Sequence, residues 1–104
     1  MMVLEAAMPV LHIAWIRFNE GVPAERIEQH MAACRGLVGR VPPVLNLKCG
    51  ASFSDRAGGL THCVVVTLPD RDSVPVYLNH PEHLAVLGAL RPDAAELRSM
   101  DIEV

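Results

Sequence analysis

The chain has 104 residues, of which 51% are hydrophobic and 20% are charged, a composition typical of one packed globular domain. Its formal net charge is −3 and its nine basic residues are dispersed, so there is no basic stripe that would neutralise nucleic-acid phosphates. No apolar run approaches the ~20 residues of a membrane helix and the start lacks signal-peptide features, so we expect a cytoplasmic protein with no membrane or nucleic-acid partner.

Residues 1–9 show no clear periodicity and are expected to form an N-terminal extension before a single domain over residues 10–104. The apolar, β-branched run 10–18 predicts the first strand. Pro23 suits the first position of a helix that ends at the proline pair 42–43. The apolar residues of this helix recur at steps of three and four, and they are Ile27, Met31, Cys34, Leu37, Val38 and Val41.

The rest of the chain predicts two strands, a divided helix and a short closing strand. The expected ranges are 44–53 and 60–68 for the strands, 74–78 and 81–92 for the helical segments, and 100–104 for the last strand. The resulting order, β-α-β-β-α-β, predicts an α+β, ferredoxin-like fold. In this fold a four-stranded antiparallel sheet carries its helices on one face.

Both faces of the predicted strands are largely apolar. In the first strand, Ala14 and Ile16 alternate with Ile13 and Trp15. A half-exposed antiparallel strand would instead alternate apolar and polar residues. Since the helices can cover only one face of the sheet, the pattern predicts a homodimer that buries the other face.

Several site classes are disfavoured by the sequence. Cys34, Cys49 and Cys63 lie among apolar residues without C-x-x-C spacing, so we expect inert core thiols. His80 and His83 have the i, i+3 spacing of a metal pair, but no third ligand accompanies them, and His80 is expected to cap a helix. There is no Gly-rich phosphate loop, nucleophile elbow or nucleotide fingerprint, so we expect no cofactor and no metal.

Residues 77–83, YLNHPEH, resemble the Y-x-x-H-P-x-H signature of the stress-responsive dimeric α/β-barrel family. The resemblance extends to His12 on the first strand, Gly50 at the end of the second and His62 at the start of the third, and it covers residues 10–104. It implies a homodimer in which two sheets close into a shared barrel with the helices outside.

The family resemblance also implies candidate site residues. Many members have no assigned reaction, but one plant member, olivetolic acid cyclase, closes a linear poly-β-ketone by an aldol condensation without a cofactor. Carried over by motif, its functional residues fall on Tyr77, His83, His12 and His62. The implied roles are a general base for His83, a hydrogen-bond donor to a carbonyl for Tyr77, and substrate binding for His12 and His62. The residues alone also allow a hydrogen-bonded core histidine at position 12 and a backbone-capping hydroxyl at position 77.

Three functions remain open from the sequence. The first is a small-molecule pocket for cofactor-free aldol-type cyclisation or isomerisation of a keto substrate. The second is a non-catalytic dimeric protein that binds a ligand or partner in a stress response, and the third is a cofactor-free monooxygenase. A cavity that Tyr77 and His83 both face would favour catalysis, a filled core would favour the second function, and oxygen consumption would indicate the third.

Overall fold

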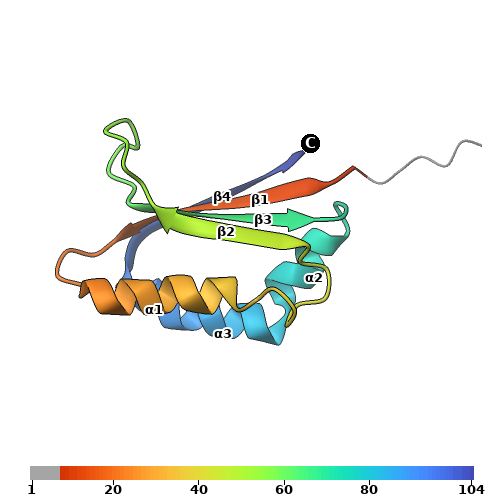
Figure 1. The fold of residues 1–104 in the computed structure, drawn as a ribbon, viewed down its shortest axis with the longest axis horizontal. Coiled ribbons are helices and arrows are strands. Elements are labelled where there is room, and N and C mark those ends of the chain that lie inside the picture. Colours follow the sequence, from red (N-terminus) through yellow and green to blue (C-terminus); the bar gives the residue numbers. More distant parts are fainter. Residues whose placement is uncertain (1–7) are drawn as a thin grey trace, which may run out of the picture.

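The computed structural model describes residues 8–104, so only Met8 and Pro9 of the expected N-terminal extension fall within it. The elements follow the expected order, with the second helical region divided in two and a short 3₁₀ turn before the last strand (Figure 1). They are β1 Val10–Phe18, α1 Ala24–Arg35, β2 Asn46–Ala51, β3 His62–Leu68, α2 Ser73–Asn79, α3 Pro81–Leu90, η1 Arg91–Asp93 and β4 Ala94–Glu103. The α+β, ferredoxin-like prediction is confirmed.

The four strands form one antiparallel sheet in the order β2-β3-β1-β4, and all the helices lie on the same side of it (Figure 1). The register places His12 of β1 opposite Val66 of β3 and Asp101 of β4. Because side chains alternate along a strand, the even-numbered residues of β1 face the helices. His12 is therefore on the helix-covered face, in the central part of the sheet.

The hydrophobic core fills the space between the sheet and the helices. Ile16 of β1 and Val66 and Leu68 of β3 are essentially inaccessible to solvent, as are Met31 and Val41 on the helix side. Burying such side chains supplies roughly 1.5–3 kcal/mol each, and this holds the helices against the sheet. A packed core on this face sets the positions of the polar side chains that interrupt it.

Two boundaries differ from the sequence-based expectation in the first helical region. Pro23 precedes the helix in an extended conformation instead of occupying its first position, and α1 ends at Arg35 instead of at the proline pair 42–43. Gly36 caps the helix, and Gly39, with φ 86°, turns the chain. Val41 is still completely buried, because the turns after α1 fold back onto the core.

The last strand is longer than expected. β4 runs over Ala94–Glu103 and pairs with β1 from one end to the other, whereas the sequence predicted a strand at 100–104 only. Most of β4 is exposed and carries charged residues, so its sequence lacks the apolar pattern of a strand. Backbone pairing with the central strand β1 therefore determines its length.

One face of the sheet is not covered by any element of the described chain. We call it the open face, and its apolar residues are Leu11, Ile13, Trp15, Cys63, Val65, Met100 and Ile102. Met100 and Ile102 are 50% and 41% exposed. Separately, none of the helices within residues 8–104 is long and apolar enough to cross a membrane.

Candidate functional site

A small cavity lies between α3 and the helix-facing side of β1 and β4. Its volume is about 60 Å³, and His12, Tyr77 and His83 line it together with aliphatic side chains and Cys34. A wider groove of about 300 Å³ shares His12, His83, Leu87 and Leu97 with it and leads to the surface. The cavity is large enough for several ligand atoms, since a single water needs roughly 10–15 Å³ by the same measure.

His83 is held in the first turn of α3. The helix begins at Pro81, and the His80 imidazole caps it by accepting a hydrogen bond from the Glu82 N–H at 3.1 Å, as expected. His83 Nδ1 lies 3.0 Å from the carbonyl oxygen of Leu78. A carbonyl only accepts, so Nδ1 donates this hydrogen bond, and in the neutral ring Nε2 keeps a free lone pair.

The surroundings of His83 favour this neutral ring. Burial lowers the pKa of His83 below its ordinary value of 6.5; the hydrogen bond to Leu78 partly opposes this, and the nearby His12 adds to it. Desolvation disfavours the charged imidazolium, so the ring is neutral at pH 7. Such a ring can accept a proton from a bound molecule.

Tyr77 is at the end of α2 with 3% of its surface exposed. The centre of its ring lies 4.4 Å from that of His83 and 5.6 Å from that of His12. Burial raises the pKa of Tyr77 well above its ordinary value, with a smaller contribution from Cys34, so the phenol stays protonated and can donate. Its hydroxyl forms no hydrogen bond within residues 8–104, and no inaccessible side-chain polar atom there lacks a partner, so the hydroxyl retains accessible surface.

His12 is fixed by an acid that the sequence analysis missed. Its Nδ1 lies 2.7 Å from the carboxylate of Asp101 on the neighbouring strand β4. Because a carboxylate only accepts, Nδ1–H is the donor, and Nε2 remains available on the other side of the ring. The buried imidazole thus has the hydrogen-bond partner that a core histidine at position 12 was predicted to have, and the ring still lines the cavity.

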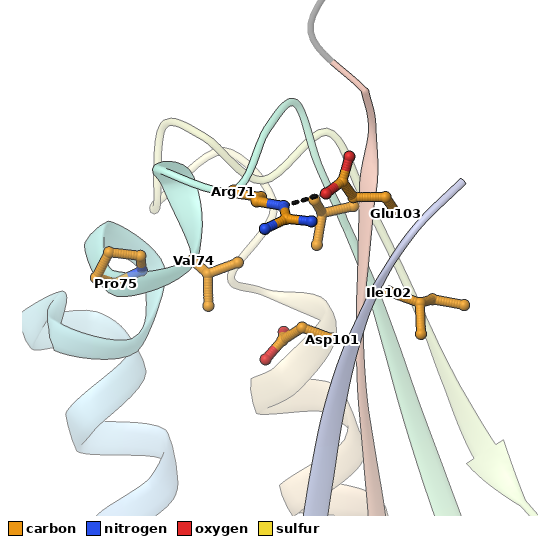
Figure 2. Close-up of a pocket in the computed structure, with 7 residues that line it drawn as sticks. Arg71, Val74, Pro75, Asp101, Ile102 and Glu103 are labelled. Carbon is orange, nitrogen blue, oxygen red and sulfur yellow. Dashed lines mark hydrogen bonds and ion pairs between the residues drawn. The ribbon is translucent and has the colours of Figure 1, made fainter.

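Asp101 also borders a second groove, of about 440 Å³, between α2 and the end of β4. Figure 2 shows its side chain pointing from β4 toward the α2 side, whereas Ile102 points to the opposite side of the strand. An ion pair between Arg71 and Glu103 lies across this groove (Figure 2). The signal in the sequence was that Asp101 is a polar residue at a helix-facing position of β4. The strand predicted over residues 100–104, however, gave no register that aligned Asp101 with His12.

The structure does not bring His62 to the cavity. His62 stands at the start of β3 opposite Ile16, with its ring edge-on to Phe18 at 5.1 Å and its Nδ1 3.0 Å from the Thr61 hydroxyl. Ile16 is four residues away from His12 along β1. At a strand rise of about 3.3 Å per residue, His62 is therefore displaced from His12 by roughly 13 Å along the strand direction. The expected cluster of four residues therefore contains three.

A second polar cluster connects α1 to η1. Asp93 receives hydrogen bonds from Arg26 at 2.6 and 2.8 Å and lies 2.7 Å from Nε2 of the buried His30. The Arg26 guanidinium, followed by His30, lowers the pKa of the Asp93 carboxyl. His30 also stacks on Phe18. Nothing in the sequence pairs residues so far apart in the chain, and the cluster holds the beginning of β4 in place.

The expectation of a buried core thiol holds for Cys34, whereas Cys49 is half-buried and Cys63 lies on the open face. All three are free, and burial raises the pKa of Cys34 to about 11. Burial likewise raises the pKa of Cys49 and Cys63, so the reactive thiolate is disfavoured at neutral pH. Within the described part of the chain, no three His, Cys, Asp or Glu side chains are grouped so that they could hold a metal ion.

Comparisons with known proteins identify the family. The family model described as the stress responsive A/B barrel domain matches residues 10–104. The stress-response A/B barrel domain-containing protein HS1 of Arabidopsis thaliana is 30% identical over 82 residues, which are 77% of this chain and 75% of the relative.

Solved structures agree in fold. A dimeric ferredoxin-like protein of unknown function from Thermobifida fusca is 30% identical with a TM-score of 0.83, covering 94% of this chain and 92% of the other. The hydroxynitrile lyase of Passiflora edulis is 21% identical with a TM-score of 0.86, covering 93% and 94%. The chain belongs to the stress-responsive A/B barrel domain family.

Proposed function

We propose that the cavity binds a small keto compound and that His83 is the general base of a cofactor-free aldol-type cyclisation or isomerisation. The observation that carries the proposal is the hydrogen bond from His83 Nδ1 to the Leu78 carbonyl. It leaves the Nε2 lone pair free, in a cavity that Tyr77 also lines. A lowered pKa keeps this base unprotonated at neutral pH.

The chemistry balances with these side chains alone. His83 Nε2 accepts a proton from a carbon next to a carbonyl, and the electron pair of the broken C–H bond forms an enolate. The Tyr77 hydroxyl donates a hydrogen bond to the oxygen that gains charge. In an aldol closure the enolate carbon then attacks a second carbonyl of the same molecule, and the proton on His83 returns to the new alkoxide.

Two further features support an active site. His12, held by Asp101 at 2.7 Å, presents a second oriented imidazole to the same cavity. The aliphatic side chains of the lining lower the local dielectric constant, which strengthens electrostatic interactions with a bound molecule. The passion-fruit protein, a hydroxynitrile lyase, is an enzyme with this fold, although its 21% identity supports the fold alone.

Proton abstraction can be tested directly by NMR. A linear β-diketone in D₂O exchanges its central methylene protons, and we expect the protein to accelerate this exchange. His83→Gln should abolish the acceleration, whereas His62→Gln should keep it because His62 lies away from the cavity. Equal acceleration by wild type and His83→Gln would refute the base. A ligand that raises the melting temperature without any exchange would instead indicate the non-catalytic binding function.

We also propose that the chain is a homodimer joined through the open face. An uncovered apolar face of a small domain favours association, and the similar Thermobifida fusca protein is dimeric. Val65→Asp places a charge in the centre of the open face and should produce a monomer in light scattering. Val76→Asp, on an exposed position of α2, is the matched control and should remain dimeric. A dimeric Val65→Asp protein would argue against this interface.

A further inference from the structure

The groove beside the cavity is lined by aliphatic and basic side chains. His12, His83, Leu87 and Leu97 line both the groove and the cavity, whereas Arg91 lines the groove and not the cavity. Both His83 and Arg91 belong to the α3 region, with Arg91 capping the C-terminal end of the helix. Eight residues at 1.5 Å each place their backbones ~12 Å apart along the helix axis. A ligand that contacts both side chains must bridge the part of this distance that the side chains themselves do not span.

The charge of Arg91 is not compensated by the described protein. Six of the nine basic side chains form ion pairs, and within residues 8–104 Lys48, Arg56 and Arg91 form none. Of these three, Arg91 borders the groove. Its guanidinium therefore has its full hydrogen-bonding capacity available.

The acids that follow Arg91 in the chain are already occupied. Asp93 binds Arg26 and His30, and Glu96 pairs with Arg17 and Arg98. Arg98 borders the same groove, but the register of β4 against β1 directs its side chain to the open face, where it meets Glu96. Arg98 is therefore unsuitable as a control, and Arg56 serves instead: an exposed arginine that likewise forms no ion pair within residues 8–104 and does not line the groove.

We infer that Arg91 binds the carboxylate of an anionic keto compound whose reacting carbon lies at His83. This inference rests on the proposed function and specifies its substrate class: a keto acid with a short aliphatic part in the inner cavity. The planar guanidinium fork can hold both oxygens of a carboxylate. A groove of about 300 Å³ accommodates a small acid of this kind.

The test compares one diketone in two charge states. The probes are 5,7-dioxooctanoate, a β-diketone with a terminal carboxylate, and its uncharged methyl ester. Dissociation constants are measured by NMR titration for wild type, Arg91→Gln, Arg91→Lys and Arg56→Gln. We expect Arg91→Gln to weaken binding of the acid by about 10- to 100-fold, as loss of a charged hydrogen-bonded pair does, while the ester is unaffected. Arg56→Gln should bind both probes like wild type.

Each outcome bears on the inference. Equal affinity of wild type for acid and ester, or equal weakening of both by Arg91→Gln, would overturn it. Partial recovery of acid binding in Arg91→Lys would support it, because the charge returns without the fork. Competition by inorganic phosphate at the same affinity as the acid would overturn the assignment to a carboxylate. Thermal unfolding of each variant shows whether the cation at the end of α3 merely stabilises the helix.

Deuterium exchange separates this inference from the proposed function. If His83 is not a base, neither probe will exchange faster with protein, yet the acid will still bind more tightly than the ester. If Arg91 is not the anchor, wild type and Arg91→Gln will accelerate exchange of the acid equally at low probe concentration.

Discussion

Tyr77→Phe separates the chemical role of Tyr77 from its packing role. The substitution removes one oxygen from a ring that is 3% exposed and leaves the ring in place. Since the hydroxyl makes no hydrogen bond within residues 8–104, no described partner is left unsatisfied. We expect a loss of less than about 1 kcal/mol in the free energy of unfolding, because the larger penalties arise when a buried partner is orphaned. Tyr77→Ala, which empties the space of the ring, should cost about 3–5 kcal/mol.

In contrast to this small loss of stability, we expect Tyr77→Phe to lose much of the activity. Removing one donor to an oxyanion typically lowers a rate by about 10²–10³, equivalent to about 2.7–4 kcal/mol. Urea unfolding gives the stability of Tyr77→Phe, and deuterium exchange of the β-diketone gives its activity. A stability loss above about 2 kcal/mol would make the hydroxyl structural. An unchanged exchange rate in a stable Tyr77→Phe protein would remove Tyr77 from the mechanism.

Three further predictions follow from the site. Because burial lowers the pKa of His83 below the unfolded value of 6.5, the stability that its neutral form provides is complete above that pH and is lost as the pH falls from 6.5 through the folded pKa. Wild type should therefore lose more stability on acidification than His83→Gln, and parallel curves of stability against pH would contradict this. The deuterium-exchange rate of wild type should rise with pH through a pKa below 6.5 and level off above it. Asp101→Ala should shift the His12 proton from Nδ1 toward Nε2, read from ¹⁵N shifts of the ring; the same tautomer in both proteins would show that the carboxylate does not set it. Cys34, with a pKa of about 11, should react with a thiol reagent at pH 8 far more slowly in native than in urea-unfolded protein, and equal rates would contradict its burial.

Part of the candidate site could be predicted from local sequence. Tyr77 and His83 are six residues apart across Pro81, and the break between α2 and α3 at this proline turns both toward one space. The proline cannot continue the preceding helix and is well suited to start the next. This is why a short motif was enough to identify these two residues.

Contacts across the sheet could not be predicted in the same way. Asp101 meets His12 only because β4 pairs with β1 in one register, and a shift of one residue would turn its side chain to the open face. His62 is on a helix-facing position, but antiparallel pairing leaves it at the end of the sheet beside Phe18. A motif specifies residue types, whereas the register decides which of them meet.

The sequence by itself determined the order of the elements, the apolar character of both faces of the sheet and the junction around Pro81, because these depend on periodicity and on backbone constraints within a few residues. Only the tertiary structure decided the length of β4, the partner of His12, the separation of His62 from the cavity and the position of Arg91 at its outer groove. These properties depend on strand register and on the packing of α3 against the sheet. Strand register and helix packing both depend on contacts between residues far apart in the chain, and a local sequence pattern does not specify such contacts.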